Sequence, residues 1–286
     1  MLKLNAYAKI NLALDVLFKR PDGYHEVAMV MQSISLADSV SLTRRRVGIK
    51  VSVDIAGLPV DSENLAYRAA ALLKQHTQIR QGVHIHLEKK IPLAAGLAGG
   101  SADAAAVLKG LNQLWGLNLS LDELSKLAAR IGSDVPFCLY NGTMLATGRG
   151  EQLADLPPLP HCYVVLGKPS IHVSTAWVYG QYKTSQIEVR PDIAAMRACL
   201  DEKSLAGVAG QLANVLESVT IQVYPEIAGI KEVMIKYGAL ASLMSGSGPT
   251  VFGLTDCPDK AGWIADQLKL QGIPQVFVAE TVAKVE

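Results

Sequence analysis

The chain opens with a strict alternation of apolar and polar residues, which is typical of a β-strand. From Leu2 to Val16 the even positions are apolar, whereas Lys3, Lys9 and Asn11 are among the polar odd positions. Side chains alternate between the two faces of a strand, so the pattern predicts a strand over residues 2–16 with Lys9 and Asn11 adjacent on its polar face. A half-exposed sheet edge fits this pattern, and so does a rigid face that holds a charged ligand.

A Pro-Asp-Gly turn at residues 19–25 ends this strand and exposes Tyr24 and His25. An aromatic ring beside an imidazole fits a site that stacks on a ligand ring and hydrogen-bonds to its edge. Tyr24 packed over the hairpin fits equally well. Further strands are predicted as far as about Ile55.

Helical periodicity follows in the first half of the chain. Residues 61–73 have the apolar spacing of an amphipathic helix, with Asp61 or Ser62 as its cap. Residues 133–137 predict a short helix with Asp134 at its start. Asp134 fits a plain cap, and it also fits a proton acceptor, because a helix start keeps a carboxylate ionised.

Residues 92–103 are the stretch with the clearest chemical signal. Three glycines fall within five positions there, between a strand-like run at 83–87 and a helical pattern at 104–115. Glycine allows close approach of the backbone to a ligand, and the N–H groups of a first helical turn bind anions, most often phosphate. A plain tight turn also fits. A Walker-type loop is excluded because Ser-Ala follows Gly100, and the dinucleotide fingerprint is absent from this stretch.

The second half of the chain has the element order of a smaller α+β domain. The proline-rich run at 155–160 predicts a domain boundary, which divides the chain into residues 1–157 and 158–286. Strands alternate with helices beyond this boundary, which favours a ferredoxin-like domain. The predicted elements are strands at 162–167 and 275–279, strand-like runs around a glycine-serine turn at 243–253, and helices at 174–179, 191–200, 204–217, 225–237 and 259–270.

Composition limits the classes of function. The chain has 286 residues, half of them hydrophobic, and 27 basic against 26 acidic side chains, so a broad electrostatic attraction to nucleic acid or membrane is not predicted. Four scattered cysteines without a C-x-x-C pair predict free thiols and no zinc site. Without a membrane span or a signal-peptide core, the expected protein is cytoplasmic. It is expected to be a monomer or a weak homodimer.

Taken together, five motifs resemble those of the GHMP-type small-molecule kinases. The match is closest to the branch that acts on a cytidyl diphosphate of methylerythritol, in the non-mevalonate route to isoprenoid precursors. The resemblance implies an α+β, two-domain GHMP kinase fold: an N-terminal ribosomal-protein-like α/β domain and a smaller ferredoxin-like C-terminal domain. The motifs are Ala8-Lys-Ile-Asn11, Pro21-Asp-Gly-Tyr-His25, residues 92–101, Gly132-Ser-Asp-Val-Pro-Phe137 and Ser245-Gly-Ser-Gly-Pro-Thr250.

This resemblance implies phosphoryl transfer from ATP, with Mg²⁺, to a hydroxyl of a small-molecule substrate. Asp134 would accept the hydroxyl proton, and Lys9 would orient the hydroxyl or Asp134 and offset charge on the moving phosphoryl group. Asn11 would bind the polyol part of the substrate. Tyr24, His25 and Tyr179 would form a pocket for cytosine.

The same resemblance places the nucleotide on the glycine-rich stretch. Backbone N–H groups there would hold the triphosphate, Ser101 would contact the phosphate or Mg²⁺, and Asn64 is the expected adenine contact. The turn at 245–250 would close the phosphate site. The residues expected to hold the triphosphate are Pro92, Leu93, Ala94, Ala95, Gly96, Leu97, Ala98, Gly99, Gly100, Ser101 and Ala102.

Three alternatives remain open at this point. One is another GHMP-type kinase that acts on mevalonate, phosphomevalonate, homoserine or a sugar, although the Tyr24-His25 loop argues against it. Another is a related decarboxylase, which nothing in the sequence specifically supports. The third is an RNA-binding module, because the larger domain resembles a ribosomal protein. Near-neutral charge and the presence of Lys9 and Asp134 argue against this third alternative.

Overall fold

The structure, a computed structural model, describes residues 1–187 and 190–284, which form two compact units. Unit 1 comprises residues 1–8, 37–91 and 98–140, and unit 2 comprises 9–36, 92–97 and the chain from 141 onward. The boundary predicted near residue 157 falls inside unit 2 and stays a prediction.

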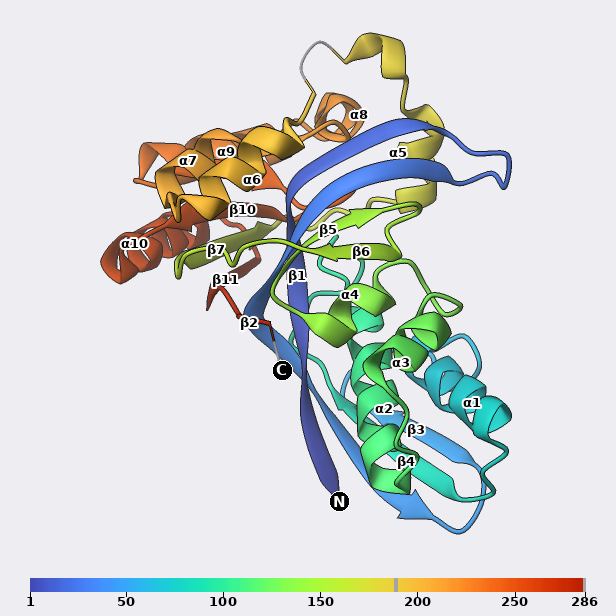
Figure 1. Ribbon diagram of the computed structural model, residues 1–286. Helices are drawn as coiled ribbons and strands as arrows, with labels where there is room; N and C mark the ends of the chain where they lie inside the picture. The colour runs from blue at the N-terminus through green and yellow to red at the C-terminus, as the bar shows by residue number, and fades with distance from the viewer. Residues whose placement is uncertain (188–189, 285–286) are drawn as a thin grey trace. The chain divides into compact units, whose positions relative to one another are not determined.

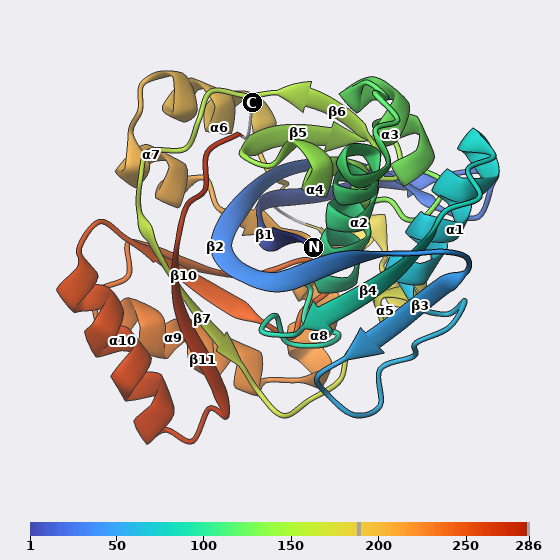
Figure 2. The same ribbon diagram turned by 90° about the horizontal axis from the view of Figure 1, so that it is seen from below.

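Unit 1 consists of a small sheet covered by helices. Strand β4 pairs antiparallel with residues 39–45 of β2 and parallel with β3. Helices α1 and α2 pack against each other, and both views show them on one face of β3 and β4 (Figure 1, Figure 2). The elements with residues in unit 1 are β1 (Leu2–Lys19), β2 (His25–Arg45), β3 (Ile49–Val53), α1 (Leu65–Thr77), β4 (Gly82–Glu88), α2 (Gly99–Trp115), α3 (Leu121–Ala128) and α4 (Val135–Tyr140).

Two helix starts in unit 1 differ from the prediction. Helix α1 is capped by Asn64, whose Oδ1 accepts from the Ala66 N–H at 2.9 Å. Asp61 instead accepts from the Glu63 N–H, so it stabilises the preceding turn. Helix α2 begins at Gly99 and not at residue 104, so Ser101 and Asp103 lie inside the helix. The buried face predicted for α2 is confirmed, since Ala105, Leu108, Leu111 and Trp115 are all buried.

Unit 2 contains a four-stranded antiparallel sheet in the order β11-β7-β10-β9. Numbered along the chain, this order is 4-1-3-2, which is the order of the split βαβ arrangement. The predicted ferredoxin-like domain is therefore confirmed, and Figure 1 shows α9 and α10 on one face of this sheet. The elements of this part are β7 (Tyr163–Lys168), α5 (Thr175–Gln181), a short 3₁₀ turn (Thr184–Gln186), α6 (Ile193–Asp201), α9 (Glu226–Lys236), β9 (Ala241–Met244), β10 (Val251–Thr255), α10 (Pro258–Leu270) and β11 (Gln275–Glu280).

The helix predicted over residues 204–217 is wrong. The chain forms α7 (Leu205–Gly210), the two-residue strand β8 (Ala213–Asn214) and then α8 (Glu217–Val223). Strand β8 pairs in parallel with β1, and the Asn214 side chain donates to the carbonyls of Met244 and Gly246, at 2.8 Å each. These contacts come from distant parts of the chain, so helical periodicity could not reveal them.

Strand β1 is not a half-exposed sheet edge. It lies inside the sheet order β3-β4-β2-β1-β8, while β5 (Thr143–Thr147) pairs with β2 and with β6 (Gln152–Asp155). From residue 9 to residue 16 every side chain is buried, and Lys9 and Asn11 are only 4% and 0% exposed. Both faces of this stretch are covered, so its polar side chains lie in an enclosed environment.

The four cysteines are free thiols, as predicted. Cys138 and Cys162 are buried, and burial raises the pKa of Cys162 to about 12. Across the described part of the chain, every helix is too short or too polar to cross a membrane.

Candidate active site

The buried part of β1 places Lys9 and Asn11 in contact. Lys9 Nζ donates to Asn11 Oδ1 at 2.8 Å, and Asn11 Nδ2 lies 3.4 Å from Met29 Sδ on β2. The backbone N–H of Lys9 donates to the Leu97 carbonyl at 3.1 Å. Strand β1 therefore holds both side chains directly beside the glycine-rich loop at 92–97.

The turn at 245–250 also contacts this loop. Ser245 Oγ donates to the Gly96 carbonyl at 3.1 Å. Gly96 has φ +75°, and a Cβ placed on it would lie 2.2 Å from the Ser245 carbonyl oxygen. Only glycine fits there without displacing the loop or the turn, because a Cβ would overlap backbone atoms. A Cβ on Gly246 would in turn lie 3.6 Å from Asn11 Oδ1, so loop, turn and strand meet at one place in unit 2.

Buried hydrogen bonds hold the turn in position. Besides the two bonds from Asn214, Thr220 Oγ1 donates to the Ser247 carbonyl at 3.3 Å. Ser247 Oγ lies 2.8 Å from Thr175 Oγ1, which is the first residue of α5. Since Asn214, Thr220 and Thr175 come from three separate elements, the turn is fixed before any ligand binds.

Helix α5 connects this turn with the predicted base pocket. Thr175 contacts the turn, and Tyr179, four residues later, lies on the same face of the helix. The rings of Tyr179 and His25 are 5.3 Å apart and inclined by 40°. The structure thus brings together two of the three residues predicted to form the pocket, and Figure 1 shows α5 beside the hairpin of β1 and β2.

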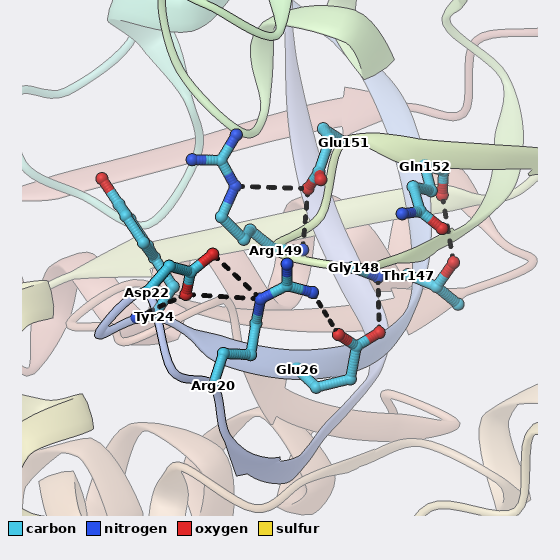
Figure 3. Close-up of polar contacts among 9 residues, drawn as sticks. All are labelled: Arg20, Asp22, Tyr24, Glu26, Thr147, Gly148, Arg149, Glu151 and Gln152. Carbon is cyan, nitrogen blue, oxygen red and sulfur yellow. Dashed lines mark hydrogen bonds and ion pairs between the residues drawn. The ribbon is translucent and has the colours of Figure 1, made fainter.

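The third predicted pocket residue, Tyr24, lies at the tip of this hairpin. Its side chain is 54% exposed, and the Arg149 guanidinium carbon lies 4.9 Å from its ring centroid (Figure 3). The predicted sandwich of Tyr24 and Tyr179 around a base stays a prediction. Sequence reasoning missed Arg149, which follows the β5 strand in the run Gly148-Arg149-Gly150.

The surroundings of His25 determine its protonation state. Burial, with the nearby Lys19 charge, holds the pKa of His25 below its usual 6.5. The ring is therefore neutral at pH 7, with one nitrogen able to donate a hydrogen bond and the other able to accept one.

In unit 1, the start of α2 offers free backbone donors. No side chain caps this helix, whose N-cap Ala98 has φ +59°. Gly100 is exposed, and a Cβ there would touch only Leu65 Cδ1, at 3.5 Å. The first-turn N–H groups, including that of half-buried Ser101, have no acceptor within their own helix. The helix start therefore suits an anion, and the triphosphate contacts of 92–102 stay predictions.

Asn64 and Asp134 are placed by two other helices of unit 1. The Asn64 side chain caps α1 and also donates to the Pro59 carbonyl at 2.7 Å, so its position is fixed. Asp134 is half-buried and directly precedes α4, where its carbonyl accepts from the Cys138 N–H at 3.2 Å. The adenine contact of Asn64 and the proton-accepting role of Asp134 stay predictions.

Sequence reasoning also missed a buried group of charges in unit 1. Lys89 Nζ lies 2.5 Å from Asp103 Oδ2 on α2 and also binds Asp38 Oδ2. Asp38 Oδ1 accepts from the backbone N–H groups of Lys90 and Ile91, at 2.6 and 2.8 Å. The available signal was that Asp38 occupies an apolar position of the alternating strand pattern of β2, between Leu36 and Val40.

Within this group, Asp103 has the environment that is least favourable to a charged carboxylate. Burial raises the pKa of Asp103 to about 7, although Lys89 opposes the rise, and Asp38 adds to it. Asp103 Oδ1 is buried without a hydrogen-bond partner. The folded environment therefore favours the protonated form of this carboxyl more than water does.

A magnesium ion at the phosphate site stays a prediction. Among the described residues no three histidine, cysteine or acidic side chains are grouped as a metal cage. Mg²⁺ commonly uses one or two protein ligands together with substrate phosphates and water, so a cage is not required. Ser101 as a ligand of Mg²⁺ stays a prediction.

Comparisons with known proteins agree with this geometry. Residues 64–142 match the GHMP kinases N terminal domain, and residues 190–273 match the GHMP kinases C terminal domain. The chain is 55% identical to the 4-diphosphocytidyl-2-C-methyl-D-erythritol kinase of Bacillus velezensis, over 92% of this chain and 91% of that protein. It is 50% identical to the enzyme of the same name from Brevibacillus brevis, over 100% of this chain and 98% of that protein.

A solved structure gives the same result in three dimensions. The crystal structure of a 4-(cytidine 5'-diphospho)-2C-methyl-D-erythritol kinase superposes with a TM-score of 0.84 and 35% identity, covering 98% of this chain and 99% of that one. The chain therefore belongs to the GHMP kinase family and is an ATP-dependent kinase.

Proposed function

We propose that this kinase transfers the γ-phosphoryl group of ATP to a hydroxyl of the erythritol part of 4-diphosphocytidyl-2-C-methyl-D-erythritol. One observation carries the proposal. Helix α5 contacts the turn at 245–250 through Thr175, and one turn later it carries Tyr179, whose ring lies near that of His25. A site with a polar buried end and an aromatic end suits a substrate that has a polyol at one end and a base at the other.

The aromatic end suits a cytosine ring. Tyr179 and Tyr24 offer faces for stacking, and the neutral His25 ring can donate or accept a hydrogen bond at the edge of the base. A site that uses such polar groups discriminates against substrates that lack the base, because the groups would then be left unpaired. Mevalonate and homoserine have no ring to fill this end.

At the polar end, phosphoryl transfer needs groups that position the substrate and groups that stabilise negative charge. Asn11 binds the polyol, and Lys9 offsets the negative charge that moves with the phosphoryl group. Asp134 accepts the proton of the attacked hydroxyl. The enclosed position of Lys9, only 4% exposed, strengthens its electrostatic effect because water screens it little.

The nucleotide is held by backbone and not by a lysine of Walker type. The loop at 92–97 lies against the turn at 245–250, and the uncapped start of α2 supplies further N–H donors. A bound Mg²⁺ would supply positive charge that offsets the negative charge on the phosphates. Ser101 is the side chain best placed in the sequence to contact that ion.

The test is a substrate panel for the purified chain. ATP consumption is measured with the cytidyl diphosphate substrate, mevalonate, phosphomevalonate and homoserine, each with Mg²⁺ present. We expect turnover with the first substrate only. Turnover of mevalonate or homoserine without turnover of the cytidyl substrate would place the chain in another branch of the family. Release of carbon dioxide from a phosphorylated acid would indicate the related decarboxylase chemistry.

A further inference from the structure

Arg149 covers one face of an exposed aromatic ring. Its guanidinium carbon lies 4.9 Å from the centroid of Tyr24, within the range of a cation–π contact. Figure 3 shows the two side chains next to each other, Tyr24 from the tip of the first hairpin and Arg149 from the turn between β5 and β6. Because the guanidinium occupies one face of the ring, a stacking partner has the other face.

The guanidinium of Arg149 forms an ion pair with the Glu151 carboxylate. The backbone N–H of Arg149 donates to Glu151 Oε2 at 2.7 Å, and the guanidinium Nε lies at an ion-pair distance of 3.8 Å from the same oxygen. The two side chains are 29% and 18% exposed, which is low for charged residues on a turn. An arginine that is paired with a carboxylate and partly buried loses less freedom when a ligand binds.

The tip that carries Tyr24 and the turn that carries Arg149 are bonded to each other. Glu26 accepts from Arg20 Nη1 at 2.5 Å with one oxygen and from the Gly148 N–H at 2.9 Å with the other. Asp22 accepts from Arg20 and from the Tyr24 N–H, at 3.2 and 3.1 Å (Figure 3). Glu26 thus joins two loops that are more than a hundred residues apart, and it fixes the distance between Tyr24 and Arg149.

We propose that Arg149 is a positioning residue for substrate recognition, which holds the Tyr24 ring in the orientation that stacks on the cytosine base. The inference rests on the proposed function. An exposed tyrosine on a hairpin tip has several rotamers open to it, and a substrate must select one when it binds. The Arg149 contact holds one rotamer of Tyr24 before the substrate binds. Its loss is therefore expected to weaken substrate affinity and to leave the rate of the chemical step unchanged.

The first experiment compares Arg149→Ala with wild type in steady-state kinetics on the holoenzyme with ATP and Mg²⁺. The KM for the cytidyl diphosphate substrate is expected to rise about three- to tenfold, from the lost cation–π contact and the lost ordering of Tyr24. The kcat and the KM for ATP are expected to stay within about twofold of wild type. Arg149→Lys keeps a cation without the planar fork and recovers part of the lost affinity.

The matched control is Arg46→Ala. Arg46 is an exposed arginine that makes no hydrogen bond or ion pair with the described residues, so its removal leaves the KM unchanged. Arg149→Met keeps the length of the side chain without its charge, and this variant carries the test if the alanine variant does not fold. A thermal melt shows which variants are folded.

A double-mutant cycle separates positioning from direct contact. In a Tyr24→Ala background, Arg149→Ala is expected to raise the KM no further, because the ring that it orients is gone. An equal rise in both backgrounds would show that Arg149 binds the substrate directly and would overturn the positioning role. An unchanged KM in the single variant would overturn it too.

The same data distinguish failure of this inference from failure of the proposed function. If the wild type shows no turnover of the cytidyl substrate and no calorimetric binding of cytidine diphosphate, the proposed function fails and this inference fails with it. If the wild type turns over and Arg149→Ala has the wild-type KM, only the inference about Arg149 fails.

Discussion

Lys9 and Asn11 are polar groups in a strand interior, where burial costs free energy unless partners satisfy the groups. Lys9 Nζ has Asn11 Oδ1 at 2.8 Å, and the two side chains are 4% and 0% exposed. Apolar residues of the same size would serve the strand at least as well for stability. The pair therefore fits a role in chemistry better than a role in holding the sheet together.

The variant Asp134→Asn tests whether the Asp134 carboxylate accepts the proton of the attacked hydroxyl. The amide keeps the size of the side chain but cannot take a proton, so kcat is expected to fall by about a hundredfold or more, with the KM for ATP nearly unchanged. Steady-state kinetics with ATP and the cytidyl substrate measure both quantities. Asp266→Asn on the exposed surface of α10 serves as the control with full activity. A variant with normal kcat and lost ATP binding would contradict the assignment.

His25 predicts a pH dependence of substrate affinity. Burial and the Lys19 charge lower its folded pKa below 6.5, so the ring is neutral at pH 7 and becomes charged only at lower pH. The KM for the cytidyl substrate is expected to rise as the pH falls from 7.5 to 5.5, with its midpoint below 6.5. The His25→Gln variant should bind more weakly and lack this step. A midpoint above 6.5 would mean that the substrate or another group titrates.

Single elements of this fold depend on contacts that the local sequence does not contain. Periodicity predicted β1, α2 and the helices around β9 and β10, because a long apolar stripe specifies its own geometry. It placed the start of α2 five residues too late, since Gly99, Gly100 and Ser101 are weak helix formers that packing against Ile91 and Leu65 holds in place. It missed β8 because a two-residue strand has no period.

The site was predicted in part for the same reason. Lys9, Asn11 and the glycine loop could be found from local patterns and from the family resemblance. Their burial could not be found, because the covering elements come from distant parts of the chain. The Arg149–Tyr24 contact and the Asp38–Lys89–Asp103 group join residues separated by 14 to 125 positions, and no local pattern marks such pairs.

At the element scale, Gly96→Ala tests the loop-and-turn contact. The new Cβ would lie 2.2 Å from the Ser245 carbonyl oxygen at a φ of +75°, so loop or turn has to move. We expect a loss of stability of about 1–3 kcal/mol and a clear rise in the KM for ATP, measured by chemical denaturation and kinetics.

Gly262→Ala is the matched control for this substitution. Gly262 lies inside α10, and a Cβ there meets no atom within 4 Å. Alanine is expected to stabilise that helix by about 0.5–1 kcal/mol and to leave activity unchanged. If both variants behaved alike, the close approach of Gly96 to the turn would have no bearing on the site.

For the whole molecule, stability should depend on the buried Asp103. Its folded pKa of about 7 lies above the unfolded value near 3.9, so between these values the folded state holds more protons and stability falls as the pH rises. Asp103→Asn removes this dependence. Its Tm is expected to exceed that of wild type at pH 8 by more than at pH 5, with a free-energy difference of about 1 kcal/mol or more.

Calorimetry at the two pH values measures this difference. Asp201→Asn, which changes an exposed carboxylate at the end of α6, is the control and should shift the Tm equally at both pH values. A lower Tm for Asp103→Asn at pH 8 would show that the ionised carboxylate stabilises the fold through Lys89.

The route of the chain through the two units bears on how it folds during translation. Residues 1–8, 37–91 and 98–140 complete unit 1 by the time residue 140 has emerged from the ribosome. The segment 9–36 is made early but pairs with residues 143–146, with Ala213 and, at Ile34, with Thr281. The pairings with β8 and with Thr281 therefore wait for the last third of the nascent chain. A message truncated near residue 157 would release a product that lacks these later partners and leaves part of β1 unpaired, which makes it a substrate for chaperones or for aggregation.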